Sequence, residues 1–267
     1  AEALLICCDY AVTNEQRFGC YSENGTHAVN LSESMGSIPG VIPFDLVSGW
    51  PADPGYSAVV VTVPYALWRR GGDMATMAQS FDGIRAYADY LLRHLTDGMV
   101  QYGMLGDWLS LQPVDEGFGN SDVPRVSAFS GALSLQMAAE MADALNQTVD
   151  HQRFLAAVRV MRERYHAVFF EPDSQSYGNC SQVANILPLV LGCVPTEKMR
   201  QVSAALVASL SQECTGLQEP TILTGGVGSR YIWEALVLIN RTDLAMQLAL
   251  KRTEPSLAWM ITQGPGT

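Results

Sequence analysis

The chain has 267 residues, of which 48% are hydrophobic and 16% are charged, and its formal net charge is −11. This composition predicts a globular fold with a well-buried core rather than a disordered chain. The acidic balance argues against nucleic acid or an anionic membrane surface as partners, because basic residues recognise both. No apolar run reaches the roughly 18–20 residues that span a bilayer, so we expect no membrane segment.

The first part of the chain contains an irregular segment and then two helices. Residues 1–55 have no sustained apolar periodicity, and we predict an irregular segment that carries several carboxylates. Val59–Val63 has the β-branched composition of a strand, but a single strand among helices would leave its backbone groups unpaired, so we predict a helix. Apolar residues at spacings of three and four predict a long helix over residues 74–95, with Gly98 as its C-terminal cap.

The rest of the chain is predicted to form helical pairs. A helix that Pro124 opens pairs with one whose apolar positions run from Phe154 to Phe169. Two more pairs are expected at Ser181–Gly192 with Thr196–Leu210, and at Ser229–Asn240 with Thr242–Lys251. Short connections predict antiparallel neighbours, and the pairs recur at a longer spacing than short helical repeats. We therefore predict an all-α barrel in a single domain over residues 1–267, with the hairpins in residues 56–267.

Cysteine, histidine and asparagine patterns bear on metals and on the cellular compartment. The six cysteines form no C-x-x-C pair and are too scattered for a disulfide scaffold, and no histidine spacing fits a zinc hydrolase, so we expect no metal site. Five asparagines begin an Asn-x-Ser/Thr sequon, namely Asn24, Asn30, Asn146, Asn179 and Asn240. In a secreting eukaryote these sequons would predict an extracytoplasmic glycoprotein, whereas in a bacterium they carry no such meaning.

Several short segments follow one another in an order that is typical of one enzyme family. They are Arg17-Phe18-Gly19 in a carboxylate-rich stretch, Gly55-Tyr56-Ser57-Ala58, Gly106-Asp107-Trp108-Leu109, the turn Thr224-Gly225-Gly226, Arg241–Ala245 and Glu254-Pro255-Ser256. In this order they resemble the catalytic domain of bacterial α-L-rhamnosidases. The resemblance covers nearly the whole chain. It implies a six-hairpin (α/α)6 barrel that is incomplete after Thr267, and further domains of the same polypeptide as possible partners.

The resemblance also implies an activity. Its members are inverting glycoside hydrolases that remove terminal α-L-rhamnose from glycosides or polysaccharides, and they use no cofactor. Inversion needs one carboxyl group as general acid and another as general base. The family's acid aligns with Gln16, and Glu15 beside it is the candidate acid, while the family's base falls after Thr267. Asp9 and Glu23 align with the two aspartates of the same motif and complete the candidate catalytic group.

Sugar-binding residues are implied by the same motifs. Arg17 belongs to the first motif, and Tyr56 stands where the family has a tryptophan that stacks on the sugar. Ser57 stands at or near the position of a family aspartate, and Trp50 lies just upstream as a further aromatic candidate.

The pair Asp107 and Trp108 also suits sugar binding, because an aromatic ring covers the C–H face of a sugar and a carboxylate accepts bonds from its hydroxyls. The structural alternatives are that Asp107 is a helix N-cap and Trp108 is a core anchor.

Two other functions remain open. Gln16, Ser57 and the missing base favour a non-catalytic sugar-binding or interaction protein that is derived from the same fold. The barrel would also suit a glycosidase that acts on a different sugar, and a plain helical scaffold is a third alternative. Sugar binding without turnover would identify the first, and turnover of another glycoside would identify the second.

Overall fold

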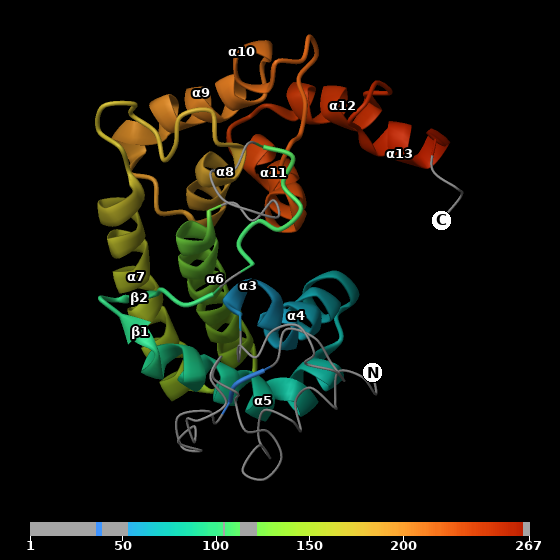
Figure 1. Ribbon diagram of the computed structural model, residues 1–267. Helices are drawn as coiled ribbons and strands as arrows, with labels where there is room; N and C mark the ends of the chain where they lie inside the picture. Colours follow the sequence, from blue (N-terminus) through green and yellow to red (C-terminus); the bar gives the residue numbers. More distant parts are fainter. Residues whose placement is uncertain (1–35, 39–52, 104, 113–121, 264–267) are drawn as a thin grey trace, which may run out of the picture. The chain divides into compact units, whose positions relative to one another are not determined.

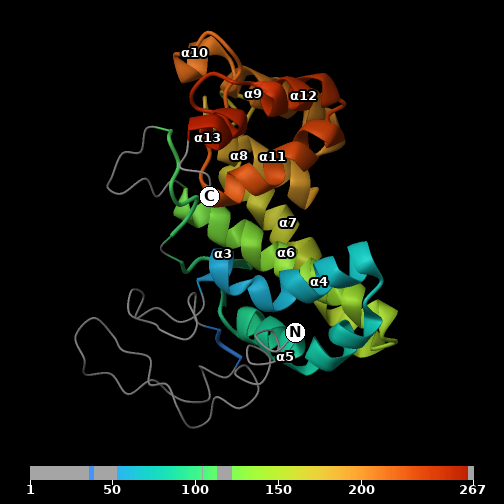
Figure 2. The same cartoon turned by 90° about the vertical axis from the view of Figure 1, so that its right-hand side faces the viewer.

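Helices make up nearly all of the regular structure in the described part of the chain (Figures 1 and 2). The computed structural model describes residues 36–38, 53–103, 105–112 and 122–263. Its contacts divide into two units, residues 1–104 with 130–164 and residues 105–129 with 165–267, and each is described by itself below. The single domain over residues 1–267 stays a prediction.

The elements of the first unit and the two helices shared between the units are α3 (Pro54–Ser57), α4 (Val59–Gly71), α5 (Met74–Arg93), β1 (Leu95–Thr96), β2 (Met99–Val100), α6 (Val123–Ala144) and α7 (Thr148–Phe169). Those of the second unit are α8 (Gln182–Leu191), the 3-10 helix η1 (Thr196–Lys198), α9 (Met199–Ser209), α10 (Gln212–Thr215), α11 (Gly226–Leu238), α12 (Thr242–Leu250) and α13 (Leu257–Gln263).

Helices α4 and α5 form the first hairpin. The helix predicted for Val59–Val63 is confirmed, because these residues begin α4. The helix ends at Gly71 and is capped by Gly72, whose φ of 70° is the left-handed conformation that glycine adopts without steric cost. The next helix begins directly, because the Asp73 carboxylate accepts a hydrogen bond from Thr76 N at 2.9 Å and caps α5.

The long apolar stripe of α5 is confirmed as a core face, but the predicted cap is wrong. Met77, Phe81, Ile84, Ala88 and Leu91 are all buried. The helix ends at Arg93, and Gly98 lies instead in the turn between β1 and β2. There Asp97 and Gly98 have φ values of 51° and 74°. An Asp-Gly pair with positive φ at both positions is typical of a two-residue hairpin turn, and this local preference placed the glycine beyond a short hairpin.

In the second unit, α8 lies beside α11, and both views show the contact (Figures 1 and 2). Nearly all residues of α8 are buried, as expected for a helix that is apolar on every side. Ser181 caps its start and Gly192, with φ of 67°, follows its end, as the predicted range requires. Helix α9 follows through η1, so the predicted partner helix is also confirmed.

The hairpin of α11 and α12 differs from the prediction at its start. Helix α11 begins at Gly226 rather than at Ser229, because a carboxylate from a distant segment caps its first turn, as the next section describes. Asn240, with φ of 57°, ends this helix, and Thr242 begins the next. Asn146 and Thr148 repeat the same arrangement between α6 and α7. The asparagines of these two sequons therefore have an explanation in turn chemistry, since asparagine tolerates positive φ.

One disulfide was missed by the sequence analysis. Cys180, just before α8, is bonded to Cys214 in α10. The two cysteines are 34 residues apart in sequence, and no local spacing indicates their pairing. Cys193 is largely buried, and its thiol donates a hydrogen bond to the Pro188 carbonyl at 3.5 Å. Cys7, Cys8 and Cys20 lie outside the described residues.

Candidate functional site

The structure describes three of the eight predicted site residues. Tyr56 lies in α3 of the first unit and is half-buried, while Asp107 and Trp108 are neighbours in a loop of the second unit. The other five, Asp9, Glu15, Arg17, Glu23 and Trp50, lie outside the described residues.

Two polar residues near Tyr56, Asp53 and Ser57, form hydrogen bonds with the backbone of the protein. Ser57 is fully buried, and its hydroxyl donates a hydrogen bond to the carbonyl of Ile38 at 2.6 Å. The Asp53 carboxylate accepts a bond from Gly55 N at 2.9 Å and caps α3. Ser57 stands at or near the position of a family aspartate. Its hydroxyl is buried and bonded to the Ile38 carbonyl.

Asp107 is fully buried and caps a helix that lies far along the sequence. Its Oδ2 accepts a hydrogen bond from Gly225 N at 2.8 Å, and its Oδ1 accepts bonds from Val227 N at 2.9 Å and Gly228 N at 2.8 Å. The first N–H groups of a helix have no partner within it, and Gly225 at the N-cap of α11 has no side chain to supply one. The Asp107 carboxylate fills that role and carries the negative charge that a helix N-terminus favours.

Burial and hydrogen bonding act on this carboxyl in opposite directions. Loss of solvent raises the pKa of Asp107, and the three backbone N–H bonds limit the rise. These contacts agree with the N-cap alternative and make Asp107 a positioning residue for the loop. Direct contact between Asp107 and a sugar stays a prediction.

Trp108 is the exposed aromatic residue of this loop. Its side chain is 42% exposed, while its backbone carbonyl accepts a hydrogen bond from Gly226 N at 2.9 Å. Leu109, which follows, is 67% exposed and has φ of 65°. A rigidly attached backbone with exposed apolar side chains is suited to contact the C–H face of a ligand.

The glycines of the Thr224–Gly228 turn allow the loop to approach so closely. A Cβ on Gly225 would lie 2.2 Å from the Trp108 carbonyl oxygen and 2.4 Å from that of Asp107. A Cβ on Gly228 would lie 2.6 Å from the Thr224 Cβ. From the sequence alone, this segment is predicted only as a turn between hairpins. The Gly-Gly-x-Gly pattern was the signal for close backbone contact, and it did not indicate the partner.

A pocket of about 400 Å³ adjoins the loop. Its walls are mostly apolar, with hydroxyl groups from Thr224, Ser229 and Ser256 among them. They include both the glycine turn and the Pro255-Ser256 motif. The lining residues are Leu109, Leu111, Ile222, Thr224, Gly225, Gly226, Ser229, Trp233, Leu248, Lys251, Pro255, Ser256, Leu257 and Met260. None of these is a carboxylic acid, so the acid and base of hydrolysis would have to come from outside this set of described residues.

Lys251 is the charged residue of the pocket wall. It is largely buried, its ammonium donates a hydrogen bond to the Thr221 hydroxyl, and burial lowers its pKa. Among the residues that the structure describes, no group of three or more His, Cys, Asp or Glu is placed to hold a metal ion. No described helix combines the length and apolarity needed to cross a membrane.

The Arg241–Ala245 motif has a local structural role. The Arg241 guanidinium binds the Asp243 carboxylate through two hydrogen bonds of 2.9 and 2.8 Å at the start of α12. This pairing holds the pKa of Asp243 at about 2. The motif thus closes the turn that leads into α12.

Comparison with known proteins settles the family. A sequence model described as the bacterial alpha-L-rhamnosidase 6 hairpin glycosidase domain matches residues 11–267. The chain belongs to this family. The match confirms the predicted all-α, six-hairpin glycosidase fold. Of the motifs that suggested the resemblance, the Asp107-Trp108 loop and the Thr224-Gly225-Gly226 turn are in direct contact in the second unit.

Individual relatives agree with this assignment. The chain is 24% identical over 237 residues to an alpha-L-rhamnosidase of Alteromonas sp. (strain LOR), a match that covers 87% of the chain and 25% of the relative. It is 29% identical over 222 residues to an alpha-L-rhamnosidase of Streptomyces avermitilis, covering 83% of the chain and 20% of the relative. The solved structure of the alpha-L-rhamnosidase from Dictyoglumus thermophilum has a TM-score of 0.75 at 21% identity, over 98% of the chain and 30% of that protein. The chain thus spans a quarter or less of the length of the two sequence relatives.

Proposed function

We propose that this chain forms part of the catalytic barrel of a glycoside hydrolase that removes terminal α-L-rhamnose with inversion of configuration. The observation that carries the proposal is the family match over residues 11–267. The exposed Trp108, held on a loop that is anchored by Asp107, supports it, because an enzyme of this kind needs a fixed surface for the sugar ring.

In the proposed mechanism, Glu15 is the general acid that protonates the leaving oxygen, and its carboxyl must remain protonated until that step. The general base, which activates water on the opposite face of the sugar, is a glutamate that the resemblance places after Thr267. Asp9, Arg17 and Glu23 would hold the sugar hydroxyls. Trp50, Tyr56 and Trp108 would supply its apolar contacts, and Asp107 would act mainly by fixing Trp108. The reaction needs no cofactor.

The test is turnover by the full-length gene product. Release of p-nitrophenol from p-nitrophenyl α-L-rhamnoside measures the rate, and ¹H NMR during the first turnovers identifies the anomer that forms. We expect β-L-rhamnose to form first, because inversion of an α-glycoside gives the β anomer. Glu15→Gln should lower turnover by on the order of 10²–10⁴-fold, and more for an alkyl rhamnoside, whose leaving group needs protonation more.

The matched control is Glu197→Gln, the same chemical change at an exposed residue of η1. It should leave the rate unchanged. Full activity of Glu15→Gln would refute the assignment of the acid. An increase in the rate of Gln16→Glu would place the acid site at residue 16 instead.

A non-catalytic sugar-binding protein is the second candidate. Two observations favour it: glutamine occupies position 16, and Ser57 is buried against Ile38, where it offers no carboxylate to a sugar. In that case the folded full-length protein would bind L-rhamnose in calorimetry without hydrolysing the aryl rhamnoside. Turnover of another aryl glycoside instead would identify a glycosidase with a different sugar specificity.

A further inference from the structure

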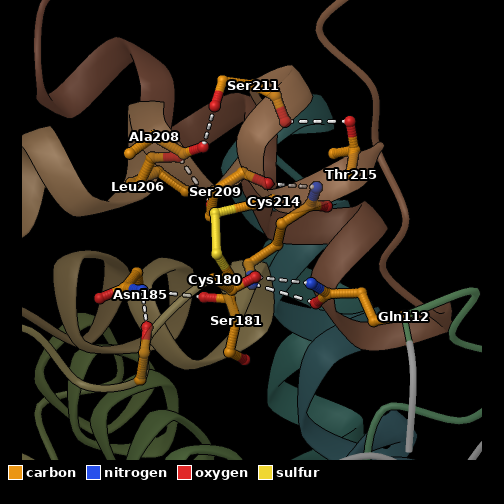
Figure 3. Close-up of a disulfide and its surroundings, with 12 residues drawn as sticks. Gln112, Cys180, Ser181, Asn185, Leu206, Ala208, Ser209, Ser211, Cys214 and Thr215 are labelled. Atoms are coloured by element: carbon orange, nitrogen blue, oxygen red, sulfur yellow. Dashed lines mark hydrogen bonds between the residues drawn. A yellow bond between two sulfur atoms is a disulfide. The ribbon is translucent and has the colours of Figure 1, made fainter. Parts of the chain in front are cut away.

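Two glutamines connect the loop that carries Trp108 to the segment of the disulfide. Figure 3 shows the first of them, Gln112, beside Cys180 and Cys214. Gln112, the last described residue of the loop segment 105–112, donates a hydrogen bond from Nε2 to the Cys180 carbonyl at 2.8 Å. Its Oε1 accepts a bond from the backbone N of Gln182 at 3.0 Å. One side chain therefore binds the backbone on both sides of Ser181, directly after the cysteine of the disulfide.

Gln182 continues the connection from the first residue of α8. It is fully buried, and its Nε2 donates to the carbonyls of Thr221 at 2.8 Å and Ser209 at 3.1 Å. Its Oε1 accepts a bond from Leu223 N at 2.8 Å. The side chain of Gln182 thus holds the extended segment that leads into the Thr224–Gly228 turn.

Leu223 is the point where this segment meets the loop. Its carbonyl accepts hydrogen bonds from Leu111 N at 2.8 Å, from Gln112 N at 3.2 Å and from the Ser110 hydroxyl at 3.1 Å. The loop is therefore fixed at one end by Asp107 on α11 and at the other by Leu223 and Gln112. Trp108 lies between the two attachments, so the position of its ring depends on both.

The disulfide fixes the backbone that receives Gln112. Cys180 has φ of 56°, a left-handed conformation that residues with a side chain rarely adopt. The bond to Cys214 holds it there, and Asn185 Nδ2 donates to the carbonyls of Gly178 at 2.9 Å and Ser181 at 2.8 Å on either side. Without the disulfide, Cys180 could return to a commoner conformation and turn its carbonyl away from Gln112.

We propose that Gln112, Gln182 and the Cys180–Cys214 disulfide form one positioning device for Trp108, so that the disulfide contributes to sugar affinity although it touches no sugar. The inference rests on the proposed function, because it takes Trp108 as part of the sugar site. If the two glutamines and the disulfide had only a structural role, replacing them would lower the stability of the protein and nothing else. A positioning role predicts a change in KM and in the exposure of Trp108 that the loss of stability does not explain.

The principal variant is Gln112→Glu in the full-length protein. It keeps the acceptor oxygen for Gln182 N and loses the donor to the Cys180 carbonyl. We expect the KM for p-nitrophenyl α-L-rhamnoside to rise roughly three- to tenfold, the effect of one lost hydrogen bond, with kcat changed less than about twofold. Gln247→Glu, the same change at an exposed residue of α12, is the control and should leave both constants unchanged.

A double-mutant cycle tests the link to the disulfide. Replacing both Cys180 and Cys214 by serine should also raise KM. When Gln112→Glu is added, the total fold-increase in KM should be smaller than the product of the two separate fold-increases, because both changes act through the Cys180 carbonyl. Effects on KM that multiply independently would overturn the proposal. So would an unchanged KM, or one that rises only at temperatures where the variant begins to unfold.

A readout without turnover separates this inference from the proposed function. Acrylamide quenching of tryptophan fluorescence, taken as the difference between each protein and its Trp108→Phe counterpart, reports the exposure of Trp108 alone. We expect altered quenching in Gln112→Glu and in the disulfide variant, but not in Gln247→Glu. Absence of turnover in the wild-type protein would refute the proposed function only. Unchanged quenching in both variants would refute the positioning device.

Discussion

A single methyl group on one of two adjacent glycines tests how the candidate site is assembled. In Gly225→Ala the new Cβ would lie 2.2 Å from the Trp108 carbonyl oxygen and 2.4 Å from the Asp107 carbonyl oxygen. Both atoms belong to the backbone, so no side chain can move aside. In Gly226→Ala the nearest atom, again the Trp108 oxygen, would be 4.0 Å away, which is an ordinary contact. Neither glycine has a positive φ that an alanine would resist.

The expected loss of stability in Gly225→Ala follows from the contacts between the loop and Gly225 that the new methyl group would disturb. Overpacking at a site that cannot relax costs about 1–3 kcal/mol. If the loop moves away, the bond from Gly225 N to the Asp107 carboxylate is lost as well, and a hydrogen bond to a charged group contributes about 1.5–3 kcal/mol. We therefore expect Gly225→Ala to lower the free energy of unfolding by about 3–5 kcal/mol. Gly226→Ala should lie between no change and a gain of about 1 kcal/mol, since alanine is the better helix former.

Urea unfolding followed by circular dichroism at 222 nm measures both variants against the wild-type protein. With an m-value of about 1–3 kcal/mol per M, the expected loss of about 3–5 kcal/mol moves the midpoint by roughly 1–5 M urea. Trp108 quenching should change in Gly225→Ala only. If the two variants unfolded within about 1 kcal/mol of each other, the close docking of the loop on α11 would be refuted.

Further predictions concern the cap, the disulfide and the α12 turn. Asp107→Asn should lower the free energy of unfolding in urea by about 2–4 kcal/mol, because its amide nitrogen would face a backbone N–H donor; a loss below about 1 kcal/mol would argue against the three bonds. Replacing Cys180 and Cys214 by serine should cost about 4 kcal/mol in the same assay, from the chain entropy of a loop that spans 34 residues, and an unchanged midpoint would contradict this. In Arg241→Gln, an NMR titration should find the pKa of Asp243 raised from about 2 toward 3.8. The stability that this pair adds is present above the unfolded-state pKa and is lost as the pH falls toward 2, so the variant should lose that pH dependence, and a pKa still near 2 would exclude Arg241 as its cause.

Predictions from apolar periodicity and turn residues were reliable where the structure of a segment depends only on its own sequence. The apolar stripe from Met77 to Leu91 predicted α5 because burial of one face is a property of that helix alone. The same kind of reasoning misplaced Gly98, where two local preferences competed. A glycine after a helix is a common cap, but Asp97-Gly98 is also a hairpin turn, and the hairpin formed.

Contacts between distant segments were outside the reach of that reasoning. The early start of α11 depends on Asp107, which precedes Gly225 by 118 residues, and nothing near Gly226 in the sequence indicates such a cap. The pairing of Cys180 with Cys214 and the burial of Gln182 are of the same kind. Such contacts depend on which helices pack together, and a motif carries that information only through its resemblance to a known family.

By itself, then, the sequence determined the helical class, most helix boundaries and, through the order of its motifs, the family. Those features depend on the periodicity of apolar residues and on short-range backbone preferences, which act along the chain. Only the tertiary structure decided that Asp107 caps α11, that Trp108 stays exposed beside it, and that two glutamines tie their loop to a disulfide. The physical reason is that buried backbone N–H and C=O groups must find partners, and in the folded chain those partners came from segments that the sequence separates.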